Sequence, residues 1–272
     1  MHSRRNDWLR TFVLVVFCLI WVAPIVYIVR VALTPPLSGG VEVETALGLS
    51  LDNFRAVLAR PELLKALGNS LVIGIASTII ILLIAIPAAF VCATHEFRGR
   101  ETIEAWILST RMLPAFVVVL PYFMLFRTVH LLDTLIGLIV MHVIVSLALA
   151  FFMLRSFFSE LPREILEAST MEGAGQFRTL FSVALPQMRA GVVATGIMVF
   201  IFSWNELAFA FTLAGGAVKT GPVAILSFMA FQSVQIAPLM AAASILVAPI
   251  AILLIVAQKS LIRGLSFGAV KA

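Results

Sequence analysis

A few polar and ionisable side chains occur inside segments of this chain that are otherwise apolar. Hydroxyl, amide, imidazole and carboxylate groups can hydrogen-bond a polar solute, and an aromatic ring can pack against it. Because such groups need a partner or water in apolar surroundings, each is a candidate for function. The candidates are Trp204, Asn205 and Glu206 in one segment, His142 and Ser146 in a second, and Arg111 in a third.

The composition indicates a protein that is surrounded by lipid. Apolar residues make up 61% of the 272 residues and charged residues only 12%, and the mean hydropathy is +1.09. Soluble domains have about 45–50% apolar and about 25% charged residues. The net charge of +5 comes from basic residues scattered at the ends of apolar segments, which argues against a nucleic-acid surface. Neither Cys18 nor Cys92 has metal-ligand spacing, so no metal site is expected.

Six segments are long and apolar enough to cross a bilayer as helices. About 20 mainly apolar residues span the roughly 30 Å hydrocarbon core, where only a helix satisfies its own backbone polar groups. We therefore predict an all-α membrane protein that forms a single domain over residues 1–272. The predicted spans are 11–33, 69–94, 105–126, 134–154, 190–214 and 238–258.

Within these spans, each polar candidate also has a structural interpretation. Arg111 can extend its charged end to the membrane surface, and His142 can hydrogen-bond a neighbouring helix. Glu206 lies deeper, and packing or gating explains it as well as contact with a transported solute does. The residues mark a candidate translocation path without identifying what passes along it.

The distribution of basic residues predicts the orientation of the chain. Twelve Lys and Arg residues lie before the first span, after the last, and in the segments 95–104 and 155–189, whereas the opposite side holds five. Basic residues concentrate in cytoplasmic segments. Both termini and the 155–189 segment are therefore predicted to be cytoplasmic, with 34–68 on the other side of a bacterial inner membrane.

The hydrophilic segment 155–189 carries the most specific pattern. A short helix should begin at Pro162, which suits the first helical position, and end at Gly173 and Gly175, which suit a helix C-terminus. An amphipathic piece should follow until Pro186 stops it before the fifth span. Taken without further comparison, this pattern also fits a solvated loop or a helix on the lipid surface.

The same segment resembles the EAA loop of ABC-importer permeases, which reads Glu-Ala-Ala, two residues, Asp-Gly-Ala, and Leu-Pro about ten residues later. The chain differs from that pattern by Ser169 in place of alanine and Glu172 in place of aspartate. The resemblance implies a type I importer permease fold whose cytoplasmic coupling helix docks on an ATPase subunit. The residues that match or replace the motif are Glu167, Ala168, Ser169, Glu172, Gly173, Ala174, Leu185 and Pro186.

Three further stretches resemble sugar permeases of the maltose and trehalose type. They are Asn53-Phe54 with Asn69-Ser70-Leu71, the Trp204-Asn205-Glu206 element, and the tail Gly264-Leu265-Ser266-Phe267-Gly268-Ala269-Val270-Lys271. Size and an arginine-rich, lysine-poor composition point within that group to the mycobacterial trehalose permeases. The resemblance implies a di- or oligosaccharide as the transported solute.

The chain has no G-x-x-x-x-G-K-[ST] phosphate loop, so ATP and Mg²⁺ should bind to separate ATPase subunits, and the chain itself should be neither catalytic nor cofactor-binding. The resemblance implies three kinds of protein partner: a second, non-identical permease, a pair of ATPase subunits and an extracytoplasmic sugar-binding protein.

Two other classes of protein stay open at this point. A transporter driven by an ion gradient could use Arg111, His142 and Glu206 as a relay, although the chain shows no convincing inverted repeat. A structural membrane subunit with no path of its own is the other. An ATPase partner would exclude both.

Overall fold

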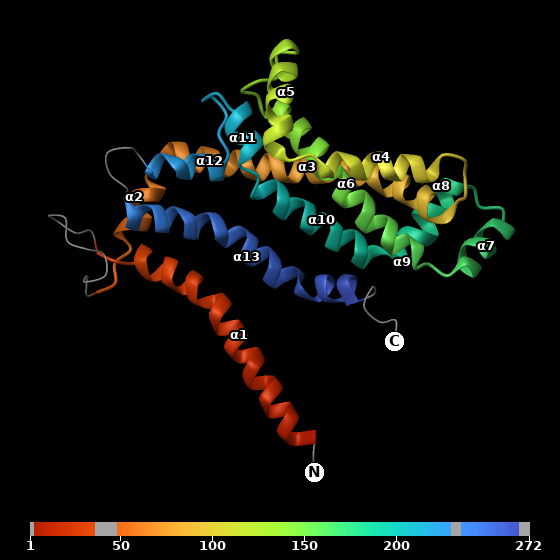
Figure 1. Ribbon diagram of the computed structural model, residues 1–272, viewed down its shortest axis with the longest axis horizontal. Helices are drawn as coiled ribbons and strands as arrows, with labels where there is room; N and C mark the ends of the chain where they lie inside the picture. Colours follow the sequence, from red (N-terminus) through yellow and green to blue (C-terminus); the bar gives the residue numbers. More distant parts are fainter. Residues whose placement is uncertain (1–2, 36–47, 230–234, 267–272) are drawn as a thin grey trace. The chain divides into compact units, whose positions relative to one another are not determined.

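The computed structural model describes residues 3–35, 48–229 and 235–266, and all regular structure in these ranges is helical (Figure 1). Most of the tail motif 264–271 lies outside them. The chain divides into two compact units, one from residues 1–64 with 224–249 and one from residues 65–223 with 250–272. Each unit is described by itself.

The first unit contains the long helix α1 (Ser3–Ala32), the short helix α2 (Asp52–Leu58), a 3₁₀ turn (Leu226–Phe228) and the first part of α13 (Ile236–Ser266). Asn53 of α2 is buried, and its amide donates to the backbone oxygens of Ala32 at 3.0 Å and Thr34 at 2.7 Å. Asn53 therefore fastens α2 to the end of α1, which gives a structural role to a residue of the Asn-Phe motif.

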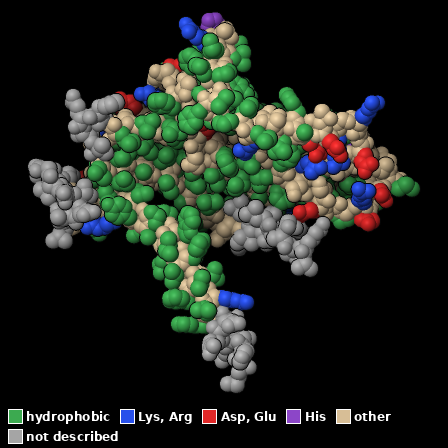
Figure 2. Space-filling model, in the orientation of Figure 1, with side chains coloured by type: hydrophobic (Ala, Val, Ile, Leu, Met, Phe, Trp, Pro, Cys, Tyr) green, Lys and Arg blue, Asp and Glu red, His purple; other side chains and the backbone are tan. Residues whose placement is uncertain are grey.

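The second unit holds the remaining helices, which range from three to 34 residues in length. They are α3 (Pro61–Thr94, except its first turn), α4 (Arg100–Met112), α5 (Ala115–Thr128), α6 (Leu135–Ser159), α7 (Arg163–Met171), α8 (Gln176–Arg178), α9 (Leu185–Gln187), α10 (Arg189–Trp204) and α11 (Ala208–Leu213), with α12 (Gly221–Ile225) at the boundary between the units. Apolar side chains cover much of the visible helical surface, and charged side chains gather over α4, α7 and α8 (Figure 2).

The core of the second unit lies between α3, α6 and α10. Ala85 and Ala89 of α3 are fully buried, and such small side chains let neighbouring helices approach closely. The rings of Phe90 and Phe158 meet edge to face, with 5.6 Å between their centroids, and Val199 of α10 belongs to the same cluster. This packing holds together the helices that carry the polar residues within the spans.

Four helices are long and apolar enough to cross a membrane unbroken, namely 8–32, 61–94, 135–159 and 236–258. They correspond to predicted spans one, two, four and six. Two bent pairs bring the number in the described residues to as many as six. The all-α membrane architecture is therefore confirmed.

The third predicted span, 105–126, was wrong as a single helix. Two helices, α4 and α5, take its place, and their axes differ by 98°. Leu113 is extended because it precedes Pro114, and the ring of a proline disfavours helical backbone in the residue before it. Pro114 therefore separates two helices within this segment.

The fifth predicted span, 190–214, is also interrupted. Helix α10 ends at Trp204, and α11 begins only at Ala208. A further bend of 82° separates residues 176–187 from α10. The break after Trp204 falls within the Trp-Asn-Glu element, so the helix of this span is interrupted at that element.

Candidate coupling loop and polar cluster

The predicted helix in the 155–189 segment is confirmed as α7. Pro162 is its N-cap, and Gly173 follows its end with φ of +77°, the left-handed conformation that glycine adopts readily. The N–H of Gly173 donates to the oxygen of Thr170 at 2.9 Å, and that of Ala174 to Ser169 at 3.1 Å. Gly175 was wrongly assigned to this helix end, because its φ of −70° is ordinary and it begins α8.

A hydroxyl pair fixes α7 to the helical stretch that follows it. Ser169 is buried, and its Oγ lies 2.9 Å from Oγ1 of Thr179. Serine in place of the alanine of the family pattern therefore adds a hydrogen bond between α7 and the helical stretch that follows it. These two pieces are the two arms of the loop.

The second arm runs from Gln176 to Gln187 through a π-helical turn, Thr179–Ala184. Pro186 was expected to stop this arm, but it lies inside α9, at the first positions that tolerate proline. The π-helical turn lies directly before it, where the missing N–H of proline leaves a carbonyl without its α-helical donor. The direction of the chain changes two residues after Pro186, at Met188.

The matching residues Glu167, Ala168, Glu172 and Gly173 are exposed on the loop. Beside them, Met171 is 89% exposed and Phe177 is 78% exposed. Large apolar side chains on an otherwise polar loop are typical of a surface that another protein or the lipid surface covers. From the sequence, Phe177 was expected only as part of the amphipathic piece, and Met171 was given no role, although apolar residues on a hydrophilic segment are a usable signal.

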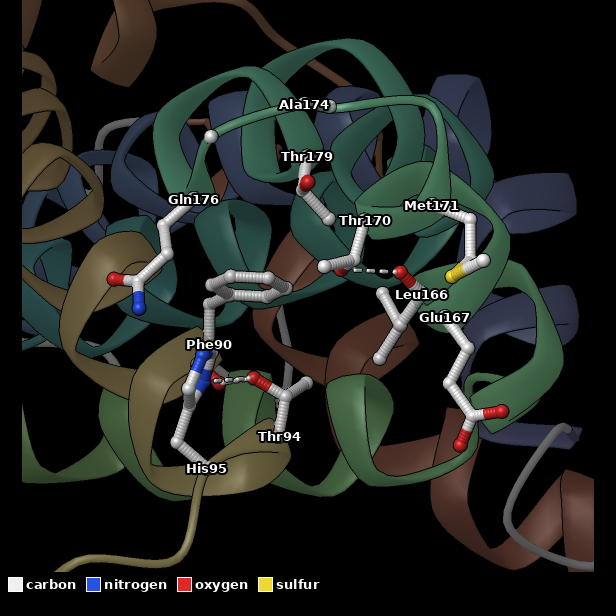
Figure 3. A pocket seen from close by; sticks show the side chains of 11 residues that line it. Phe90, Thr94, His95, Leu166, Glu167, Thr170, Met171, Ala174, Gln176 and Thr179 are labelled. Carbon is white, nitrogen blue, oxygen red and sulfur yellow. Dashed lines mark hydrogen bonds between the residues drawn. The ribbon is translucent and has the colours of Figure 1, made fainter.

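A hollow of about 630 Å³ lies between this loop and the end of α3 (Figure 3). One wall is formed by α3 and the residue after it, with Thr94 donating to the oxygen of Phe90 at 2.8 Å and paired with Nδ1 of His95 at 2.8 Å. The other wall includes Glu167 and Thr170 of α7. Beside the hollow, Leu166 of α7 packs against the buried cluster that contains Phe90 of α3, so α7 and the end of α3 share one core.

Two of the polar candidates within the spans lie close together. His142 is 2% exposed, its Nδ1 is 2.5 Å from Oγ of Ser203, and its Nε2 is 3.8 Å from Oε2 of Glu206. Oγ of Ser203 also lies 3.3 Å from Oγ of Ser77. The cluster thus joins α3, α6 and the end of α10.

Glu206 directs its carboxylate at the start of α11. The backbone N–H groups of Phe209 and Ala210 donate to its two oxygens, each at 2.9 Å. These N–H groups have no partner within the helix, so an acidic side chain stabilises them. Glu206 therefore satisfies the backbone at the break in span five.

The other candidates have different surroundings. Trp204 is buried, with its ring 5.7 Å from that of Phe200, whereas Asn205 is exposed and donates to the oxygen of Ile201 at 2.9 Å. Ser146 is buried one turn from His142 on α6. The guanidinium of Arg111 lies 5.5 Å from the ring centre of Phe202.

Sequence reasoning missed Ser77 and Ser203, because single serines in apolar helices are common. Only the position of Ser203 directly before Trp204 could have suggested a role for it.

The chain belongs to the family of binding-protein-dependent transport system inner membrane components, because the model of that family matches residues 85–267, more than half of its length. An ABC transporter permease protein of Streptomyces antibioticus, ORF1, is 33% identical over 223 residues, covering 82% of this chain and 97% of that protein. The trehalose transport system permease protein SugB of Mycobacterium tuberculosis is 33% identical over 226 residues, covering 82% of each.

A solved structure supports the fold independently. It is the crystal structure of a bacterial ABC transporter involved in the import of the acidic polysaccharide alginate. The TM-score is 0.78, the match covers 94% of this chain and 96% of that chain, and 20% of residues are identical. The predicted importer-permease fold is confirmed, and the chain is a multi-pass permease subunit of an ABC transporter.

Proposed function

We propose that this chain forms half of the translocation path of an ATP-driven importer for a di- or oligosaccharide. A separate ATPase drives it through residues 162–175, with Glu167, Ala168 and Gly173 at the contact. The single observation that supports this most strongly is the exposed turn at Gly173, flanked by the exposed apolar side chains of Met171 and Phe177. A loop built for solvent alone would gain nothing from these two side chains.

The path needs a second half, and this chain has apolar surface to meet it. The described part of α1 is largely exposed, and α4 has no buried residue. In the bilayer, these faces contact lipid and a second, non-identical permease. An extracytoplasmic binding protein delivers the sugar. The candidate contacts of the sugar along the path are Asn205 and the region of Glu206 and His142.

Trehalose is the sugar that we propose to test first, with maltose as the next choice. The trehalose permease SugB is among the relatives that match most of this chain. Hydroxyl-rich solutes of this kind suit a path lined by amide and aromatic groups.

Co-purification tests the proposed partners. The chain is tagged in its native host, extracted in mild detergent and the bound proteins are identified by mass spectrometry. We expect an ATPase, a second permease and a sugar-binding protein. Recovery of the chain alone, or with proteins that bind no nucleotide, would contradict the proposal and favour an ion-driven transporter or a structural subunit.

Cysteine labelling tests the orientation. In a variant whose Cys18 and Cys92 are replaced, single cysteines are introduced at Ala217 and at Gln176, two exposed positions. We expect an impermeant thiol reagent to label Ala217→Cys in intact cells and Gln176→Cys only after the cells are opened. The reverse pattern would place 155–189 outside and remove it from contact with a cytoplasmic ATPase.

A further inference from the structure

The 214–220 loop between α11 and α12 is held by a single carboxylate. Oδ1 of Asp133 accepts hydrogen bonds from the backbone N–H groups of Gly215, Gly216 and Val218 at 3.0, 3.2 and 3.0 Å. Its Oδ2 accepts from Ala217 at 3.0 Å. Four consecutive N–H groups of the loop therefore converge on one side chain, and the N–H of Asp133 itself donates to Leu213 at 2.9 Å.

Two neighbouring residues at the start of α3 hold the far end of the loop. The amide of Asn69 donates to the backbone oxygen of Lys219 at 2.9 Å. Oγ of Ser70, which is buried, accepts from the N–H of Gly221 at 2.8 Å. Asn69 and Ser70, which contributed to the family resemblance, thus hold this loop together with Asp133.

The chemistry at Asp133 requires a carboxylate. Backbone N–H groups that converge in this way form an anion site, and hydrogen bonds to a charged acceptor are stronger than neutral ones. Burial raises the pKa of Asp133, but the four backbone donors outweigh this and hold the pKa below its usual value of 3.8. An asparagine would turn an NH₂ group towards some of the donors and leave them unpaired.

The position of the 214–220 loop in the chain indicates why a fixed loop conformation is useful. Asp133 lies just before α6, whereas α7 follows its other end, so the 25 residues of α6, about 37 Å of helix, separate the clamp from the coupling loop. The exposed residues Gly215, Gly216 and Ala217 have little apolar side chain to place in lipid. A loop ordered in advance loses less entropy when a protein binds to it.

We infer that Asn69, Ser70 and Asp133 are positioning residues for transport, which hold the 214–220 loop in one shape at the extracytoplasmic end for contact with the sugar-loaded binding protein. This inference rests on the proposed function. The three side chains act through the loop backbone and touch no sugar. They also tie the loop to α3 and α6, so that the outer ends of these helices and the loop move together.

The test compares Asp133→Asn with Asp52→Asn. Asp52 also belongs to a predicted outer segment, but it is exposed. Its partners among the described residues are the nearby Ser50 and Arg55 on the surface, where ion pairs contribute little. Loop order is measured in the detergent-extracted complex as the rate of tryptic cleavage after Lys219, an exposed residue. Function is measured as initial rates of labelled trehalose uptake by cells of the native host, over a range of concentrations.

For Asp133→Asn we expect cleavage after Lys219 to be about tenfold faster, because hydrogen bonds to a charged group are lost. The apparent KM for uptake should rise about tenfold, while the maximal rate changes by less than about threefold, because productive contact with the binding protein becomes rarer. Asp52→Asn should match the wild type in both measurements. Asn69→Ala, which removes one neutral hydrogen bond, should shift cleavage and KM in the same direction by about threefold.

Three results would overturn the inference: unchanged cleavage in Asp133→Asn, faster cleavage with unchanged KM, or an equal effect of Asp52→Asn. A fall in maximal rate together with loss of the co-purified ATPase would also overturn it, because that result describes general unfolding. Failure of the proposed function gives a different pattern. Wild-type cells would then take up no labelled trehalose, and the cleavage rates alone would decide whether the clamp orders the loop.

Discussion

Changing Gly173 to valine together with Glu167 to alanine should abolish sugar uptake and release the ATPase, while the permease pair still inserts and associates. Gly173 has φ of +77°, where a residue with a Cβ is strained by about 1–3 kcal/mol and a β-branched residue fares worst. Glu167 is exposed on the docking face, and losing one polar partner in a buried interface costs about 1–3 kcal/mol. Uptake and pull-down of the ATPase are measured in the same membranes.

The chain offers a matched control two residues away. A Cβ added at Gly173 or at Gly175 would meet no atom within 4 Å, but only Gly173 has a positive φ. Gly173→Ala should therefore lose far more ATPase than Gly175→Ala. Normal transport and ATPase retention in the double variant would remove this loop from the mechanism and revive the ion-gradient alternative.

Replacing Glu206 by alanine should reduce both the assembled complex and its uptake activity by tenfold or more. The variant leaves the N–H groups of Phe209 and Ala210 without acceptors inside the membrane, at about 1–3 kcal/mol each. Glu206→Gln keeps one oxygen, so its loss should be intermediate. The measurements are the amount of complex in the membrane and the rate of uptake per complex.

Asn205→Ala separates support of the backbone from contact with sugar. Its side chain is exposed and, within the described part of the chain, donates to the oxygen of Ile201 in α10, the helix that ends just before it. If Asn205 lines the path, this variant should raise KM for uptake and leave assembly intact.

The Glu206 prediction has its own contradicting outcome. If Glu206→Ala and Glu206→Gln both assembled and transported as the wild type does, neither a gating nor a binding role for Glu206 could stand.

The parts of this fold that the sequence predicted are those governed by local rules. Hydropathy located the spans. Pro162 and Gly173, which lie at the two ends of α7, located the coupling helix, because proline fixes φ of its own residue and glycine readily adopts the positive φ that ends a helix. Ser169 was recognised as a departure from the family pattern, but its partner Thr179 lies ten residues away and became visible only in the structure.

The parts that were not predicted depend on contacts between distant segments. Apolarity alone did not distinguish a straight span from the broken helices at Pro114 and Glu206. The contacts of His142 with Ser203 and of Asp133 with the 214–220 loop join residues 61 or more positions apart. Serine and aspartate at such positions look ordinary until the helices that bring them together are in place.

The central claim, that ATP hydrolysis by a separate subunit drives sugar through this chain, is tested most directly in proteoliposomes. The purified complex is reconstituted with its binding protein outside, labelled trehalose outside and ATP with Mg²⁺ inside, and uptake is measured with and without ionophores that collapse all ion gradients. We predict uptake that requires ATP and the binding protein and that the ionophores leave unchanged. Uptake that continues without ATP and stops when the ionophores are added would contradict the account.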